Sequence, residues 1–286
     1  MRIAMIGLGE VGRAYARALK HAGHDLYLCD PRPGVQATEL AQSWGLTVHA
    51  SVDAWLGECA WVMSCVTGAH ALQVAQQCIA HAHESAILCD WTTASPDTKR
   101  AACRAARQQG LPYLDVAIMG AVALGQHKTP LLVAGDGAAA FQVLMEQADA
   151  NVSVIAGGVA GDAVALKILR SAFTKGMEAL SVELLMAAER QGVRAQLYAQ
   201  LQDIDATPLQ TFIEMLVRTH VVHARRRIHE VQDAAAEMRS HHIESQVLPG
   251  VERRFAKTIA GLDQEPLAPV EPTLEQALQW LLRQQA

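Results

Sequence analysis

The sequence predicts an α/β protein in which a doubly wound, mostly parallel sheet is followed by an all-helical C-terminal domain. Short apolar runs alternate with helix-like stretches through the first half of the chain, which is the pattern of strands joined by crossover helices. A glycine-rich turn follows the first run, and after about residue 160 the pattern becomes almost entirely helical. We therefore expect one domain over residues 1–160 and a second over residues 161–286.

The strands are predicted from apolar runs that recur about every 25 residues in the first half, each trailed by an alanine- or glutamine-rich stretch. The runs are continuous and do not alternate with polar residues, which is typical of parallel strands covered on both faces. The predicted strands are RIAMIG (2–7), DLYLCD (25–30), WVMSCV (61–66), AILCD (86–90), LPYLDV (111–116), TPLLVAGD (129–136) and VSVIAG (152–157).

The helical half begins after a glycine-rich hinge, GGVAGD, at residues 157–162. From Gly161 to Arg190 the pattern predicts one very long helix, with Gly176 as the position where it is free to bend. A proline-rich connector, Asp263–Pro272, precedes a last predicted helix, Thr273–Gln285.

The glycine-rich turn has the spacing of a dinucleotide-binding Rossmann motif. Gly7, Gly9 and Gly12 stand between the first strand and the first helix, and Asp30 closes the second strand. Gly7 allows the tight turn, Gly9 allows close approach of a pyrophosphate, and Gly12 allows close packing of the helix. The candidate cofactor-binding residues are Gly7, Leu8, Gly9, Glu10, Val11, Gly12, Asp30, Arg32, Val66, Thr67 and Thr93.

The end of the second strand favours NAD over NADP. The carboxylate of Asp30 suits the hydroxyls of the adenosine ribose and repels a 2′-phosphate. Arg32 supports the alternative, because an arginine in this loop is able to bind that phosphate. Further strand ends, which carry Thr67, Thr92 and Thr93, are expected at the same crevice, although hydroxyls there are equally typical of turns.

Composition excludes several classes of protein. The 286 residues carry a formal net charge of -5, which is unlike a basic nucleic-acid-binding surface, and no 18-residue apolar run predicts a membrane span. The first residues lack the charged-then-apolar pattern of a secretory signal, so we expect a cytoplasmic protein. The six cysteines form no CxxC pair and are expected to be buried thiols, and His220 and His223 lack a third ligand for zinc.

Lys167 interrupts an apolar run near the start of the long helix. At helical spacing it shares one polar stripe with other side chains, and such a stripe alone indicates a solvated face. Its position only two turns after the hinge instead places it beside a cleft between domains, where ligands commonly bind. The residues of this stripe are Lys167, Arg170, Ser171, Thr174, Lys175 and Glu178.

These motifs together resemble the β-hydroxyacid dehydrogenase superfamily, which includes 6-phosphogluconate and 3-hydroxyisobutyrate dehydrogenases. KILRSAFTKGMEAL (167–180) is most similar to a little-characterised 6-phosphogluconate dehydrogenase-like branch with a distinctive C-terminal domain. The resemblance covers both domains and rests on IGLGEVG (6–12), DWTTASP (90–96), the substrate-loop segment 114–136 and GGVAGDAVALKILRS (157–171).

The resemblance implies that Lys167 is the general acid/base of a hydride transfer between NAD(P) and the carbinol or carbonyl carbon of a β-hydroxy acid-like substrate. It also implies a small anionic substrate and a homodimer built through the helical domains. The family's loop serine is replaced by Met119, and its asparagine four residues after the lysine is replaced by Ser171. The candidate substrate-binding residues are Thr93, Met119, Gly120 and Ser171.

A general base must be neutral, so the pKa of Lys167 has to be lowered by burial and by nearby cations, for which Arg170 and Lys175 are candidates. Two other functions stay open. One is an imine reductase of the same superfamily, although those relatives generally have another residue in place of the lysine. The other is a non-catalytic NAD(P)-binding regulatory module. The basic segments Thr219–Glu230 and Arg239–Gln246 are either solvated helix faces or anion-binding groups.

Overall fold

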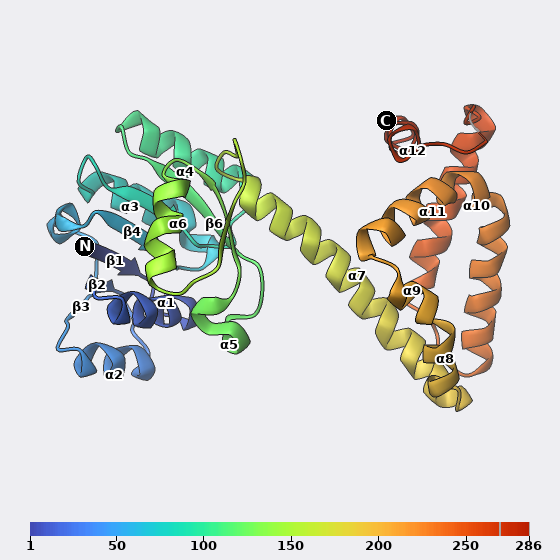
Figure 1. Ribbon diagram of the computed structural model, residues 1–286, viewed down its shortest axis with the longest axis horizontal. Helices are drawn as coiled ribbons and strands as arrows, with labels where there is room; N and C mark the ends of the chain where they lie inside the picture. Colours follow the sequence, from blue (N-terminus) through green and yellow to red (C-terminus); the bar gives the residue numbers. More distant parts are fainter. Residues whose placement is uncertain (269, 286) are drawn as a thin grey trace. The chain divides into compact units, whose positions relative to one another are not determined.

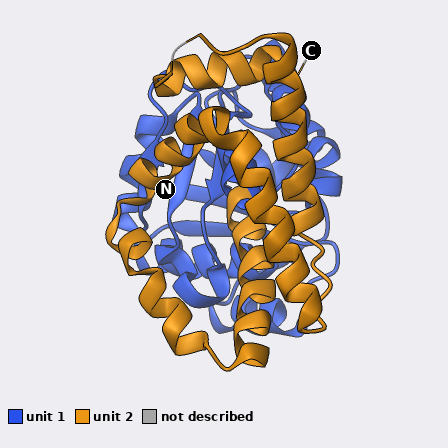
Figure 2. Cartoon of the chain, turned by 90° about the vertical axis from the view of Figure 1, so that its right-hand side faces the viewer, with its two compact units in different colours: residues 1–172 blue, residues 173–286 orange. Residues whose placement is uncertain are grey.

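The computed structural model describes residues 1–268 and 270–285 (Figure 1). Contacts divide the chain into two compact units, Met1–Ala172 and Phe173–Ala286 (Figure 2). The division falls inside helix α7 (Asp162–Gln191) and later than residue 160, because the first turn of α7 packs on the sheet unit. Ala163 is fully buried there beside Ala117 and Ala134. Pro269, within the predicted connector, and Ala286 lie outside the described residues.

The sheet of the first unit has eight strands in the order β3-β2-β1-β4-β5-β6-β7-β8. All neighbouring strands are parallel except β6 and β7, which pair antiparallel. This confirms the mostly parallel, doubly wound sheet; the two-residue β3 is too short for its pattern to have predicted it. The strands are β1 (Arg2–Ile6), β2 (Asp25–Cys29), β3 (Val48–His49), β4 (Trp61–Ser64), β5 (Ile87–Asp90), β6 (Tyr113–Ile118), β7 (Leu131–Gly135) and β8 (Val152–Val154).

Helices cover both faces of the sheet, which explains why the strands are apolar throughout. Ile3 and Met5 of β1 pack with one set of helices, and Ala4 and Ile6 pack with the other set. The first set is α1 (Glu10–His21), α2 (Val35–Ser43) and α6 (Ala138–Gln147), and the second is α3 (Ala71–His81) and α4 (Pro96–Gln108). The short helical elements are η1 (Ala54–Glu58), η2 (Gly68–His70), α5 (Val122–Gly125) and η3 (Gln126–Lys128).

The second unit is helical, as predicted. Its core forms where Val221 of α10, together with Ala277 and Trp280 of α12, is buried. Thr273 caps the last helix through a capping box with Gln276, which confirms the predicted start of that helix. The helices after α7 are α8 (Arg194–Gln200), α9 (Gln202–Ala206), α10 (Leu209–Ser240), α11 (Leu248–Gln264) and α12 (Leu274–Arg283).

Helix α7 runs without interruption from Asp162 to Gln191 and passes through Gly176. Among the described residues, no helix is long and apolar enough to cross a membrane. All six cysteines are unpaired, and each is buried except Cys65, which is half-buried.

Candidate functional site

Three glycines of the turn between β1 and α1 have different roles: Gly7 and Gly12 lie in close contact with the backbone, and Gly9 lies beside open space. Gly7 has a φ of +89°, and a Cβ there would lie 2.9 Å from the carbonyl carbon of Cys65. A Cβ on Gly12 would lie 2.0 Å from the carbonyl oxygen of Gly7. A Cβ on Gly9 would meet nothing within 4 Å. Gly7 and Gly12 are therefore required by the fold, whereas Gly9 leaves open space beside the backbone.

This open space lies at the N-terminus of α1, where a phosphate binds well. Gly9 is the N-cap of α1, and no side chain caps the helix. The amide groups of the first turn therefore remain available to an anion, and the helix dipole favours negative charge there. The turn thus fits the pyrophosphate of a dinucleotide.

Asp30, directly after β2, is held by the backbone next to this turn. Its Oδ2 accepts a hydrogen bond from the amide of Leu8 at 2.8 Å, and its Oδ1 accepts one from the amide of Arg32 at 2.9 Å. The side chain of Arg32 is exposed. The carboxylate is therefore fixed beside the glycine-rich turn, where an adenosine ribose is bound in this type of fold.

A cavity of about 270 Å³ in the first unit is lined by residues from five separate segments of the chain. Glu10 and Val11 come from the start of α1, and Lys167 comes from α7. Predicted site residues are thus brought together from the cofactor turn and from the long helix. The lining residues are Glu10, Val11, Cys65, Val66, Trp91, Thr92, Thr93, Ile118, Gly120, Val122 and Lys167.

Of the site residues predicted outside the glycine-rich turn and the loop of Asp30, three do not line this cavity. Thr67 instead shares a hydrogen bond of 2.9 Å with Nδ1 of His70. Met119 packs partly buried against the cluster of Ala117, and its carbonyl oxygen accepts a hydrogen bond from Arg170. Ser171 is likewise not part of the lining. The sequence missed the apolar wall formed by Trp91, Ile118 and Val122, since apolar residues at strand ends carry no distinctive signal.

Lys167 is half-buried at the cavity, whereas its apolar neighbours Leu166 and Ile168 are 46% and 48% exposed. A solvated polar stripe would show the opposite distribution. Burial lowers the pKa of Lys167, the positive charge of Lys99 lowers it further, and the carboxylate of Asp115 opposes both. The amine of Lys167 makes no hydrogen bond to any of the described residues.

The cation that lowers the pKa of Lys167 is therefore Lys99, and the expectation that Arg170 and Lys175 do so is wrong. The guanidinium of Arg170 donates instead to the carbonyl oxygen of Met119 at 3.0 Å. Lys175 forms an ion pair with Glu178. Both side chains are exposed, so water screens their charges.

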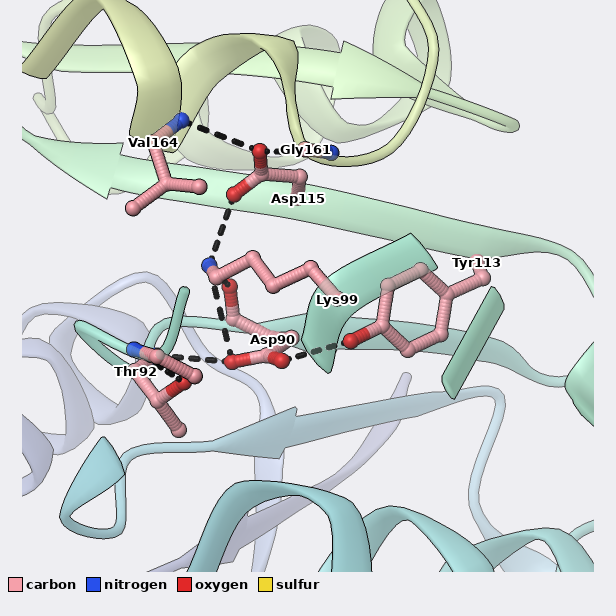
Figure 3. A network of polar contacts seen from close by, with 8 residues as sticks. Asp90, Thr92, Lys99, Tyr113, Asp115, Gly161 and Val164 are labelled. Carbon is pink, nitrogen blue, oxygen red and sulfur yellow. Dashed lines mark hydrogen bonds and ion pairs between the residues drawn. The ribbon is translucent and has the colours of Figure 1, made fainter. Parts of the chain in front are cut away.

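A buried network of charged side chains links α4, β5 and β6 (Figure 3). The side chains of Lys99 and Asp115 are fully buried, and Nζ of Lys99 lies 2.6 Å from Oδ1 of Asp115. The same amine donates to the carbonyl oxygen of Asp90 at 2.9 Å and lies 3.6 Å from its Oδ1. The hydroxyl of Tyr113 donates to Oδ2 of Asp90 at 2.5 Å. Burial and the charge of Asp90 raise the pKa of Tyr113, which keeps the hydroxyl protonated.

Two segments of the candidate site are held by this network (Figure 3). Oδ2 of Asp115 accepts hydrogen bonds from the amides of Gly161 and Val164, each at 3.0 Å, and thereby fixes the start of α7. Oδ1 of Asp90 accepts a hydrogen bond of 2.8 Å from the amide of Thr92, which lines the cavity. The network therefore positions both the helix of Lys167 and the cavity wall.

The basic segments of the second unit make mostly local contacts. Nε2 of His220 lies 2.8 Å from the hydroxyl of Thr258, and burial together with the charges of Arg254 and Arg227 lowers the pKa of His220. Four of their charged side chains pair with carboxylates of the same unit. These pairs are Arg225 with Asp263, Arg226 with Glu230, Arg239 with Glu244 and His241 with Glu237, while Arg190 donates to the carbonyl oxygen of His241.

Comparison with known protein families gives two matches. Residues 2–157 match the NAD binding domain of 6-phosphogluconate dehydrogenase, which is more than half of the chain. Residues 188–258 match a domain of unknown function (DUF1932). The first match contains the glycine-rich turn and every lining residue of the cavity except Lys167.

Individual relatives agree with these matches. An uncharacterised 28.5 kDa protein of Methanothermus fervidus is 25% identical over 85% of this chain and 93% of its own length. The conserved protein MTH1747, of unknown function and described as structurally similar to 3-hydroxyacid dehydrogenases, is 28% identical with a TM-score of 0.63, covering 91% of this chain and 97% of its own. An imine reductase of Aspergillus terreus with bound NADPH4 is 16% identical with a TM-score of 0.74, covering 96% and 97%; it shares the fold.

Proposed function

Since the chain belongs to the family of the NAD binding domain of 6-phosphogluconate dehydrogenase, we propose that it is an oxidoreductase in which Lys167 is the general acid/base. The observation that carries this proposal is the half-buried amine of Lys167 in one cavity with the start of α1. A lysine of lowered pKa at a cofactor-binding turn has the chemistry of a proton-transfer group.

The proposed reaction is oxidation of a carbinol, or reduction of the matching carbonyl, on a β-hydroxy acid-like substrate. When bound, the nicotinamide supplies the hydride acceptor or donor. In the oxidative direction, neutral Lys167 takes the hydroxyl proton of the substrate; in the reductive direction, charged Lys167 returns a proton to the carbonyl oxygen. The apolar wall formed by Trp91, Ile118 and Val122 keeps water away from the reacting carbon.

An imine reductase is the alternative within the same fold, and solved imine reductases share that fold at 16% and 17% identity. Lys167 supports the dehydrogenase, because its amine at the cavity suits proton exchange with a hydroxyl. To separate the two functions, the purified chain is mixed with NAD or NADP and panels of β-hydroxy acids or cyclic imines, and the nicotinamide absorbance is followed. Turnover of imines alone, or of neither panel with either cofactor, would contradict the proposed reaction.

We expect the chain to prefer NAD to NADP by about tenfold or more. The fixed carboxylate of Asp30 lies beside the ribose site, and a second negative charge a few ångströms away costs on the order of 1 kcal/mol or more there. The exposed guanidinium of Arg32 offsets part of this cost. Dissociation constants of the two cofactors, measured by fluorescence titration, check the preference.

Two variants test which side chain sets this preference. Asp30→Asn keeps an oxygen for the amide of Leu8 while it removes the charge, so it is expected to improve NADP binding and narrow the difference. Arg32→Ala is expected to weaken NADP binding and to widen the difference in affinity between NAD and NADP. A wild-type chain that binds NADP more tightly would mean that Arg32 governs the choice.

We further propose that the chain forms a homodimer. Helix α7 exposes a series of large apolar side chains between Phe173 and Met186, and soluble monomers seldom leave this much apolar surface uncovered. Light scattering at micromolar concentration should give twice the 30.8 kDa mass of the chain, and a monomer mass would refute the proposal. The exposed residues are Phe173, Met177, Leu180, Val182, Leu184 and Met186.

A further inference from the structure

We propose that the buried Lys99–Asp115 ion pair sets the charge of the Lys167 amine: Lys99 favours its neutral form and Asp115 its charged form. In this view the pair has a positioning role and does not itself touch substrate. The inference rests on the proposed function of Lys167 for its importance in the reaction, but the charge of Lys167 is measurable without cofactor or substrate.

The ion pair is buried close to the start of α7, so its charges act on the amine of Lys167 with little screening by water. Both side chains are fully buried, and Nζ of Lys99 lies 2.6 Å from Oδ1 of Asp115. Oδ2 of the same carboxylate accepts hydrogen bonds from the amides of Gly161 and Val164 at the start of α7, six and three residues before Lys167. Because buried charges are screened little, a change in either one is transmitted to the half-buried amine of Lys167.

The two members of the pair act on Lys167 in opposite directions. Burial lowers the pKa of Lys167 most, the charge of Lys99 lowers it further, and that of Asp115 raises it. Lys99 is also the ion-pair partner of Asp115, the carboxylate that opposes the lowered pKa of Lys167.

Other charged or titratable groups lie on the elements that line the cavity or belong to the buried network, and none of them shifts the pKa of Lys167 as Lys99 and Asp115 do. Burial raises the pKa of Cys65, so its thiol is neutral at ordinary pH. Lys99 and Asp115 remain the two charges that act on Lys167. The groups considered are Glu10 of α1, Cys65 after β4, Asp90 of β5, Lys99 of α4, Asp115 of β6, and Asp162 and Arg170 of α7.

A buried cation such as Lys99 lowers the pKa of Lys167 more effectively than an exposed cation would. A general base that takes a proton must be neutral in the working pH range, and exposed cations such as Lys175 are screened by water. A buried, charged Lys99 without a carboxylate partner would strongly destabilise the fold. Its ion pair with Asp115 offsets that cost. The pair therefore provides a fixed positive charge that persists in the interior.

The test titrates Lys167 in the full chain by NMR with lysine labelled at the ε-carbon, its signal assigned by its loss in Lys167→Arg. Lys99→Met is expected to raise the titration midpoint, so that at a fixed pH below it the neutral fraction falls roughly threefold or more. Asp115→Asn, whose amide oxygen still accepts from Gly161 and Val164, is expected to lower the midpoint. The double variant should lie between the two single variants.

The opposite signs distinguish an electrostatic role from a structural one, because general loosening of the fold would move both midpoints the same way. Lys175→Met is the matched control: it removes an exposed cation of the same helix and should leave the midpoint unchanged. Equal midpoints in wild type and all variants, or shifts of one sign, would overturn the proposal. If Lys99→Met does not fold, the neutral double variant replaces it, and a midpoint equal to that of Asp115→Asn then excludes any effect of Lys99.

This measurement fails separately from the proposed function. If Lys167→Ala keeps its activity, Lys167 is not the acid/base, whatever its titration shows. If Lys167→Ala is inactive but the midpoints do not move, Lys167 keeps its role and the ion pair has only a structural one. Once a substrate is identified, the pH profile of the oxidative kcat/KM can be compared. In Lys99→Met the rise of kcat/KM should occur at a higher pH than in the wild type.

Discussion

Replacing Lys167 by alanine is expected to lower turnover by roughly 10²–10⁴-fold, which is the usual contribution of a positioned general acid or base. Cofactor binding should stay close to that of the wild type, because the glycine-rich turn and Asp30 do not contact Lys167. Turnover is measured with the substrate identified from the panels above, and cofactor affinity is measured by fluorescence titration. A variant that keeps most of its activity would show that Lys167 does not transfer the proton.

The pH dependence gives an independent check of the same role. In the oxidative direction the active form of Lys167 is neutral, so kcat/KM should rise with pH and level off above its pKa. Because that pKa is lowered by burial and by Lys99, the rise should lie at lower pH than an ordinary lysine would give. Lys175→Ala serves as the control, because it removes an exposed lysine of the same helix and should leave both the rate and the profile unchanged.

Strong local patterns predicted most of the fold. The continuous apolar runs located seven of the eight strands, because strands covered on both faces need apolar residues at every position. The antiparallel pairing of β6 with β7 was not predicted, since pairing direction depends on how the intervening segment returns to the sheet. The domain boundary was placed early because the first turn of α7 looks like any other helical turn, although Ala163 and Val164 are buried on the sheet unit.

The candidate site was predicted less completely than the fold. The glycine spacing and Lys167 were visible because each is unusual in its own segment. The buried ion pair was missed, although a signal for it exists: Lys99 lies on the same helical face as Ala102, Cys103 and Ala106, all buried, and Asp115 interrupts an apolar strand. Sequence periodicity marks each as an exception, but only the fold brings the two exceptions within 2.6 Å of each other.

The second large effect is expected at the glycine-rich turn, where two substitutions of the same size should act differently. Gly12→Ala puts a Cβ 2.0 Å from the carbonyl oxygen of Gly7, so either α1 or the turn must move. We expect a loss of about 2–4 kcal/mol of stability, together with loss of cofactor binding. The unfolding free energy is measured by denaturant titration.

Gly9→Ala should instead weaken cofactor binding by about tenfold or more while it changes stability by no more than about 0.5 kcal/mol. Its Cβ meets no protein atom within 4 Å, and the backbone of Gly9, with φ of -65° and ψ of -164°, suits alanine. The added methyl group stands where a pyrophosphate must approach the amides of α1. Gly176→Ala is the matched control, because it adds the same methyl group in open space on α7 and should leave cofactor affinity intact. Equal affinity in Gly9→Ala and the wild type would show that the dinucleotide does not bind across this turn.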